Sequence, residues 1–212
     1  MKDEALGLIN CAIDKSLFSK KNIGVTEYLA RKCGLNNKSE VMIIKNDHLA
    51  VCPITTHLDI KNVSQNIKSK TIITKIKTIQ KSLKKLFKKK PKIGVLGLNP
   101  HNGELKKNTE EITEIIPAIK YLKNLGFNIN GPLAADSVFI NDYKNYDIIV
   151  GMYHDQVLTP FKTLFKFDAI NITLGLKYFR ASPDHGVAKN IIKNDKADPG
   201  SLIKAIKYIN NL

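Results

Sequence analysis

Residues 147–165 read DIIVGMYHDQVLTPFKTLF, and the fold assignment begins from this stretch. Its first part, Asp147 to Met152, is a short apolar run rich in β-branched residues, which is typical of a buried strand. Its second part, Asp155 to Phe165, has the length and spacing of a helix. A buried strand followed directly by a helix is the repeating unit of α/β proteins, so the stretch predicts an α/β fold.

The rest of the chain repeats this alternation. Further strand-like runs are found at Leu8 to Ile13, Val41 to Ile44, Leu49 to Ile54, Ile93 to Leu98 and Ile170 to Leu174. Helical patterns are found at Thr26 to Lys32, Thr71 to Lys90, Asn108 to Leu125 and Pro199 to Asn210, and Pro117 predicts a kink or a late start in the third of these. No internal repeat or Gly/Ser linker interrupts the pattern, so we expect one α/β unit over residues 1–212.

The composition excludes several classes of protein. Of 212 residues, 43% are hydrophobic and 25% charged, as in ordinary globular proteins. No apolar run approaches the roughly 18 residues that a membrane span needs. The N-terminus shows no signal or transit peptide, so we expect a cytoplasmic protein without a membrane partner. Three cysteines without a CxxC pair do not predict a disulfide framework.

The net charge of +15 raises the question of nucleic-acid binding. Only Arg31 and Arg180 are arginines, so the charge comes from lysines spread along the whole chain, and there is no Trp. Base readout favours arginine, and RNA-binding surfaces use exposed aromatic rings. A solvated lysine surface is the better interpretation, and we expect no nucleic-acid partner.

Three of the five histidines share a context. His57, His101 and His154 each lie just beyond the carboxyl end of an expected strand. In α/β sheets ligands bind at that edge, so the three side chains could converge on a catalytic metal. The alternative is that each histidine is a hydrogen-bonded structural residue, since a lone histidine usually is.

Polar residues downstream could bind an anion. Lys162 lies two turns beyond His154, and Asn171 and Arg180 flank the run Ile170 to Leu174. Together they could hold a phosphate or carboxylate, although Lys162 could equally be one solvated lysine among many. Asp136 could orient a substrate amine or a metal-bound histidine, or it could be a helix N-cap. Motifs of the GxGxxG, GxSxG, P-loop and HExxH types are absent.

Six segments, in order and with fitting gaps, resemble the 4-hydroxythreonine-4-phosphate dehydrogenase family. They are residues 97–104 (GLNPHNGE), 131–139 (GPLAADSVF), 152–156 (MYHDQ), 171–175 (NITLG), 180–186 (RASPDHG) and 196–201 (KADPGS). The match runs from about Leu8 to the C-terminus. Any one segment would be weak evidence, but several in order are strong.

The resemblance implies a three-layer α/β/α fold like that of isocitrate and isopropylmalate dehydrogenases, with the N-terminal part missing and this chain forming the C-terminal two-thirds. It implies a homodimer with a shared active site, a divalent metal (zinc, magnesium or cobalt), and NAD or NADP. The implied reaction oxidises 4-(phosphooxy)-L-threonine to a β-keto acid, which loses carbon dioxide, in pyridoxal phosphate biosynthesis.

The resemblance also implies roles for single residues. The implied metal ligands are His57, His101 and His154. The implied substrate contacts are Thr26, Lys162, Asn171 and Arg180, and the implied catalytic residues are Asp136 and Lys162.

The chain departs from the family pattern in three places. Val25 stands where relatives usually have a histidine before Thr26, residues 105–108 (LKKN) replace a Gly-rich continuation, and the family's N-terminal segment is missing. These departures keep two alternatives open. One is a dehydrogenase of a related phosphorylated hydroxy acid, such as threonate or erythronate phosphate. The other is a non-catalytic remnant that binds metal or a partner.

Overall fold

The structure is a computed structural model that describes residues 5, 7–14, 25–34, 40–87, 90–191 and 196–211. The side chains of Thr26, Glu27, Leu86, Phe87 and Asn190 lie outside this description. The chain forms two compact units. Unit 1 combines the described parts of Met1–Asn46 and Phe165–Leu212, and unit 2 is formed by Asp47–Leu164.

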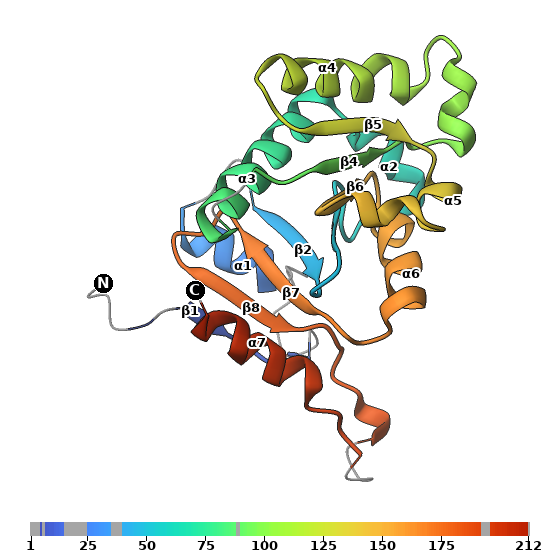
Figure 1. The fold of residues 1–212 in the computed structure, drawn as a ribbon. Coiled ribbons are helices and arrows are strands. Elements are labelled where there is room, and N and C mark those ends of the chain that lie inside the picture. Colours follow the sequence, from blue (N-terminus) through green and yellow to red (C-terminus); the bar gives the residue numbers. More distant parts are fainter. Residues whose placement is uncertain are drawn as a thin grey trace. The chain divides into compact units, whose positions relative to one another are not determined.

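The sheet of unit 2 is parallel throughout its described strands. Its order is β3-β6-β4-β5 (Figure 1). The strands are β3 (Ala50–Pro53), β6 (Ile148–Gly151), β4 (Ile93–Leu96) and β5 (Ile129–Leu133). All residues of β3, β4 and β6 are buried, as expected for parallel strands covered on both faces.

Helices lie on both faces of this sheet. The chain moves in one direction across the sheet from β3 to β4 and β5, and then returns to β6. Because crossovers between parallel strands are right-handed, the reversal places later helices on the opposite face from earlier ones. Accordingly α3 (Ser69–Phe87) and α4 (Ile116–Asn124) lie side by side, and α5 (Ala135–Val138) and α6 (His154–Phe165) lie apart from them (Figure 1).

Two expectations for the helices of unit 2 are confirmed. The helical pattern at Thr71 to Lys90 corresponds to α3, whose side chains Ile72, Ile76, Ile79 and Leu83 recur every three or four residues and are buried. The late start that Pro117 predicted for the helix over Asn108 to Leu125 is also observed. The α-helix α4 begins only at Ile116, after the π-helical turn η4 (Glu111–Ile115). Because Pro117 has no N–H, it donates no hydrogen bond to that preceding turn.

Short elements complete unit 2. They are the 3-10 turn η2 (Ile60–Asn62), the helix α2 (Val63–Asn66), and the 3-10 turns η3 (Pro100–Leu105) and η5 (Asp142–Asn145). The first two follow β3 and η3 follows β4, so these elements lie in connections that leave the carboxyl edge of the sheet.

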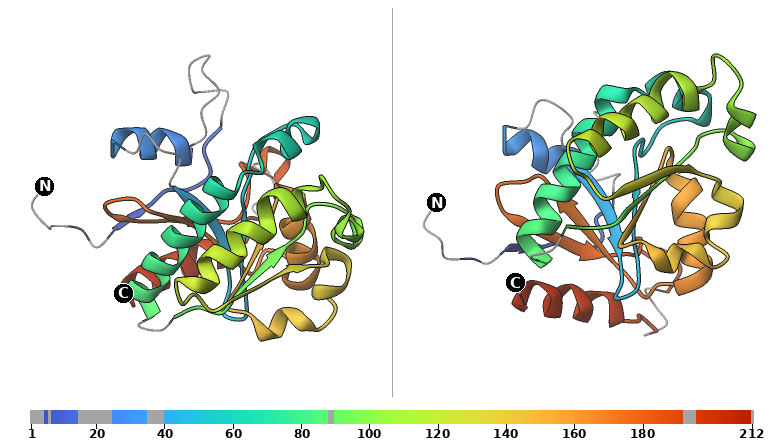
Figure 2. Two further views of the ribbon diagram at one scale, coloured as in Figure 1. Left: turned by 90° about the horizontal axis from the view of Figure 1, so that it is seen from above. Right: turned by 45° about the horizontal axis from the view of Figure 1, so that its top comes forward.

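Unit 1 has a mixed sheet in the order β1-β8-β7-β2. Strand β1 (Gly7–Ile9) is parallel to β8 (Phe179–Pro183), and β7 (Ile170–Leu174) is antiparallel to both β8 and β2 (Val41–Lys45). Helix α7 (Gly200–Asn210) packs beside β8, β7 and β1 (Figure 2). It buries Ala205 and Ile209. Helix α1 (Val25–Lys32) and the 3-10 turn η6 (Lys189–Ile191) complete the unit.

The predicted α/β class is confirmed, but two strands were missed. The sequence of β5, INGPL, contains Gly and Pro, which indicate a turn; the strand forms because it lies at an edge, where a missing N–H is tolerated. The sequence of β8, FRASP, is polar, yet it lies between β1 and β7. The strand predicted at Leu8 to Ile13 was too long, since β1 ends at Ile9. Among the described residues, no helix is long and apolar enough to cross a membrane.

Candidate metal and substrate site

His57 and His154 are brought together by the pairing of β3 with β6. The two strands are parallel with Pro53 opposite Gly151, so the chain leaves both at the same edge. Beyond the strands, the backbone N–H and Oγ1 of Thr55 both donate to the carbonyl of Met152, at 3.1 and 2.7 Å. The ring centroids of His57 and His154 are consequently 6.0 Å apart.

The two histidines line a pocket in unit 2 with a volume of about 310 Å³. Its walls come from the segments that follow β3 and β6: Thr56, His57, Leu58, Ile60, Val63, Tyr153, His154 and Asp155. Two imidazoles, a carboxylate and a phenol beside apolar side chains form a concave polar site of the kind that binds small ligands.

Asp155 selects which nitrogen of His154 is available. Nδ1 of His154 is 2.6 Å from Oδ1 of Asp155. A carboxylate oxygen only accepts hydrogen bonds, so Nδ1 carries the proton and Nε2 of a neutral ring keeps the lone pair. Carboxylate–histidine pairs of this kind orient metal-binding imidazoles.

The turn from β6 into α6 is held by Gln156. Its Oε1 accepts from the backbone N–H of Met152 at 2.7 Å, and its Nε2 donates to the carbonyl of Gly97 at 2.7 Å. A Cβ on Gly151 would lie 2.4 Å from Cγ1 of Val157, so only glycine fits where the helix starts directly after the strand. These contacts fix where α6 presents His154.

His101 lies in a left-handed turn after β4. Residues 101–104 have φ between 49° and 62° and ψ between 20° and 35°, and Leu105 has φ of 53°. For a residue with a Cβ this conformation costs roughly 1–2 kcal/mol. His101 is exposed and does not line the pocket that contains His57 and His154. In the described part of the chain no three His, Cys, Asp or Glu side chains converge on a metal site, and the three-histidine set stays a prediction.

The buried carboxylate of Glu111 holds the start of this turn. Its Oε1 accepts from the backbone N–H groups of Leu98 and Asn99 at 2.7 and 2.8 Å, and its Oε2 accepts from Nδ2 of Asn99 at 3.0 Å. Nδ2 of Asn102 donates to the carbonyl of Pro132 at 3.2 Å. Glu111 itself is fully buried.

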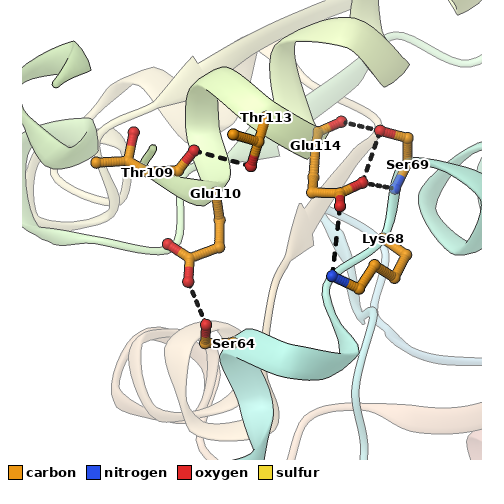
Figure 3. A network of polar contacts seen from close by, with 7 residues as sticks. All are labelled: Ser64, Lys68, Ser69, Thr109, Glu110, Thr113 and Glu114. Carbon is orange, nitrogen blue, oxygen red and sulfur yellow. Dashed lines mark hydrogen bonds and ion pairs between the residues drawn. The ribbon is translucent and has the colours of Figure 1, made fainter. Parts of the chain in front are cut away.

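Neighbouring acids tie η4 to α2 and α3 (Figure 3). Glu110 accepts from Oγ of Ser64 through Oε1 and from Nδ2 of Asn99 through Oε2. Glu114 accepts from the backbone N–H of Ser69 at 2.7 Å, from Oγ of Ser69 at 3.0 Å, and from Lys68 at 3.4 Å. The network joins the element beside the pocket to the turn that carries His101.

All three acids have a pKa below the usual glutamate value of 4.5. For Glu110 the hydrogen bond from Ser64 is the main cause. Burial raises the pKa of Glu111 and of Glu114, but hydrogen bonds from Asn99 and Leu98 to the first, and from Ser69 and Lys68 to the second, lower it more. The three carboxylates are therefore ionised at neutral pH.

Arg180 is a buried residue of β8 in unit 1, with 3% of its surface exposed. Its Nε donates to Oδ1 of Asn10 at 2.8 Å, and its Nη1 donates to Oγ1 of Thr173 at 3.1 Å. Both of these acceptors are neutral side-chain oxygens, and they fix the orientation of the guanidinium. Asn171 lies two residues before Thr173 on the same face of β7, and its buried Oδ1 has no hydrogen-bond partner among the described residues. This face of the unit 1 sheet therefore suits a polar ligand.

The remaining predicted site residues are placed as follows. Lys162 is half-buried on α6, about 12 Å of helix beyond His154. Asp136 is exposed on α5, whose N-cap is Ala134, so the alternative that Asp136 caps the helix is wrong. Thr26 lies on α1, and its side chain is outside the described residues.

Sequence reasoning missed Glu111, Asn99, Asn10, Thr173, Gln156 and Asp155. The adjacent acids Glu110 and Glu111 at the start of a helix were a usable signal, because carboxylates bind free N–H groups there. No local sequence signal indicated Asn10, since its contact with Arg180 joins residues 170 positions apart.

A family model described as pyridoxal phosphate biosynthetic protein PdxA matches residues 1–209. The chain is 40% identical over 210 residues to 4-hydroxythreonine-4-phosphate dehydrogenase from Aquifex aeolicus (strain VF5), covering 97% of this chain and 65% of the relative. It is 41% identical to the enzyme of the same name from Sulfurihydrogenibium sp. (strain YO3AOP1), covering 98% of this chain and 65% of the relative. The chain thus spans about two-thirds of the length of these relatives.

The fold agrees with the sequence match. A crystal structure of 4-hydroxythreonine-4-phosphate dehydrogenase from Klebsiella pneumoniae superimposes with a TM-score of 0.81 at 31% identity, covering 95% of this chain and 63% of that chain. A match of this extent over nearly every residue requires the same order of strands and helices. The chain therefore belongs to the PdxA family of pyridoxal phosphate biosynthetic proteins.

Proposed function

We propose that this chain carries the metal and substrate site of a dehydrogenase that oxidises 4-(phosphooxy)-L-threonine with NAD or NADP, in pyridoxal phosphate biosynthesis. The observation that carries the proposal is the pairing of His57 with His154 in one pocket, with Asp155 hydrogen-bonded to His154. Relatives that share 40% and 41% of its residues bear this enzyme name. We also propose a cytoplasmic homodimer with a shared site, as the family resemblance implies.

The residues at the pocket fit a divalent transition metal. A metal-bound ring nitrogen lies roughly 2.0–2.1 Å from the ion, so two bound rings have centroids roughly 5–6 Å apart. The observed 6.0 Å between His57 and His154 is compatible with that spacing. Imidazole nitrogens suit zinc or cobalt better than magnesium, which prefers oxygen ligands. In this proposal His57, His101 and His154 hold the ion.

The site residues would each have a separate task. When bound, a divalent cation would supply a Lewis acid for the oxygen of the substrate alcohol. The contact with Asp155 engages Nδ1 of His154, so Nε2 is the nitrogen that would hold the ion. Lys162 would donate hydrogen bonds to substrate oxygens, and Asp136 would accept a proton or orient the substrate amine.

Anion binding is proposed for unit 1. Arg180 is held rigidly by Asn10 and Thr173, and Asn171 presents a buried amide on the same sheet face. A pre-oriented guanidinium can bind a phosphate or carboxylate in two-point fashion. Thr26 is proposed as a further substrate contact. Binding energy from these groups would fix the orientation of the bound anion.

The hydride acceptor is proposed to be NAD or NADP. The sequence lacks a GxGxxG loop, so the fingerprint of the usual dinucleotide fold is missing.

The test is the formation of reduced nicotinamide by the purified chain, with added zinc or cobalt and 4-(phosphooxy)-L-threonine. We expect metal-dependent turnover that His154→Ala abolishes and His48→Ala leaves unchanged, since His48 is exposed between β2 and β3 and away from the pocket. Metal-independent turnover, or equal activity in both variants, would contradict the proposal.

A second candidate follows from Val25, which cannot hydrogen-bond a substrate where relatives usually carry a histidine. It keeps the chemistry but uses threonate or erythronate phosphate. Assaying these acids beside 4-(phosphooxy)-L-threonine separates the two candidates by kcat/KM. A folded, metal-loaded chain that turns over none of them would support the non-catalytic alternative.

A further inference from the structure

We propose that Glu111 is a positioning residue that sets the place of the His101 imidazole, and with it the metal affinity of the site. The inference rests on the proposed function, because it takes His101 as one of three ligands. It goes beyond that function by assigning a task to a buried carboxylate that no sequence motif singled out.

The turn that carries His101 needs external support. Five consecutive residues, 101–105, have positive φ, and only Gly103 among them is a glycine. Backbone in the left-handed region is disfavoured for residues with a Cβ, so such a turn persists only where its surroundings determine it. Segments of this kind are common at functional sites.

Glu111 binds the residues at which this turn begins. Its Oε1 binds the N–H groups of Leu98 and Asn99, directly before the turn begins at Pro100. Its Oε2 accepts from Nδ2 of Asn99 at 3.0 Å. The carboxylate therefore fixes the backbone that enters the turn, and displacing it would release that backbone.

The turn also leaves no space for a larger residue at Gly97, which directly follows β4. A Cβ on Gly97 would lie 2.3 Å from Oδ1 of Asn102 and 3.1 Å from Oε1 of Glu111. The turn is thus packed between the end of β4 and the carboxylate. A methyl group at Gly97 would push it from the side facing β4, without removing any hydrogen-bonding group.

Glu114 provides a matched control on the same helical turn. It is also a carboxylate that accepts from a backbone N–H and from a side chain, with a lowered pKa, but its partner is Ser69 at the start of α3 (Figure 3). A purely structural role would give Glu111→Gln and Glu114→Gln the same consequences. A positioning role predicts that only the first changes the metal site.

The experiment is a titration of the purified, metal-free chain with Co²⁺, followed through the visible absorption of the bound ion, alongside thermal unfolding. The variants are His101→Ala, Glu111→Gln and Glu114→Gln. We expect His101→Ala and Glu111→Gln to weaken Co²⁺ binding about 10-fold to 100-fold and to change the absorption spectrum alike. Glu114→Gln should lower the melting temperature and keep the wild-type affinity and spectrum.

The outcomes separate the two hypotheses. If His101→Ala binds Co²⁺ as the wild type does, the three-histidine site fails, and the inference fails with it. If His101→Ala weakens binding but Glu111→Gln does not, the proposed site stands and the positioning role is overturned. Should Glu111→Gln not fold, Gly97→Ala and Asn99→Ala decide in its place, since each disturbs the same turn; wild-type affinity in both overturns the inference.

Discussion

At the level of single residues, the hydrogen bond between His154 and Asp155 determines which ring nitrogen can bind a ligand. The carboxylate is 79% exposed and the imidazole 37% exposed, so the pair contributes little to the stability of the fold. Its effect is expected on the tautomer and orientation of the ring, and therefore on metal binding.

We predict that Asp155→Asn lowers metal affinity about 10-fold to 100-fold while the melting temperature changes little. An amide can offer an oxygen to Nδ1 but supplies no negative charge to raise the basicity of the ring. Isothermal titration with Zn²⁺ measures the effect, with Asp142→Asn on the exposed turn η5 as the control. Equal affinity in both variants would show that Asp155 does not act through His154.

At the level of elements, the connection between β6 and α6 leaves no space for a side chain at Gly151. Gly151 ends the strand, and a Cβ there would be 2.4 Å from Cγ1 of Val157 and 3.0 Å from Oε1 of Gln156. A methyl group would therefore have to push the first turn of α6 away from the strand. That turn carries His154 and Asp155.

Gly151→Ala is accordingly expected to destabilise the protein by about 1–3 kcal/mol, as overpacked sites do, and to weaken metal binding. Gly186→Ala is the matched control, because no atom of the described residues lies within 4 Å of its Cβ position. Urea unfolding and Co²⁺ titration of both variants check this. A neutral effect of Gly151→Ala on both measurements would mean that α6 shifts freely.

The contact between η4 and α3 gives a pH dependence. The pKa of Glu114 is lowered in the folded protein, since the bonds from Ser69 and Lys68 outweigh burial. A group with a lowered folded pKa contributes stability above its unfolded value, here 4.5, and this stability is lost as pH falls through the folded pKa.

Glu114→Gln should therefore be less stable than the wild type at neutral pH, and the difference should shrink as the pH falls below 4.5. Urea unfolding at a series of pH values gives both curves. Glu104→Gln serves as a control, because Glu104 is an exposed residue with a surface ion pair to Lys106. Parallel curves for Glu114→Gln and wild type would contradict the assignment.

At the level of the whole molecule, the chain spans 65% of the length of its relatives, and the shared active site of a homodimer is a proposal. Within one chain, His57 and His154 share a pocket and His101 does not line it. A partner protomer could therefore supply His101, and mixed dimers can test this.

We predict that mixing His101→Ala protomers with His154→Ala protomers restores high-affinity metal binding, although each variant alone binds the metal more weakly than the wild type. If His101 acts on the partner's pocket, a mixed dimer contains one site with all three histidines. If all three come from one chain, no mixed dimer has an intact site. Co²⁺ titration after unfolding and refolding the mixture distinguishes the two, and sedimentation shows whether the 23.7 kDa chain dimerises.

Much of the fold could be predicted because it depends on local patterns. The run Asp147 to Met152 is apolar and β-branched, and the stripe of α3 repeats every three or four residues, so burial alone specifies a strand and a helix. The sequence also predicted that His57 and His154 lie at the same edge of the sheet, since each follows a strand and parallel strands end at one edge. The expectation of one α/β unit over residues 1–212 stays a prediction.

Other features were decided only by the tertiary structure. Strand β8 is polar and forms because β1 and β7 lie on either side of it, and Arg180 finds Asn10 only across that pairing. The turn at His101 takes its left-handed form where the carboxylate of Glu111 binds the backbone of Leu98 and Asn99. The sequence by itself determined the α/β class, the family motifs and the edge at which polar residues gather, because hydrophobic periodicity is local. Strand order and burial decided which polar groups meet at that edge. The physical reason is that a buried charge is stable only where distant segments of the chain supply its hydrogen bonds.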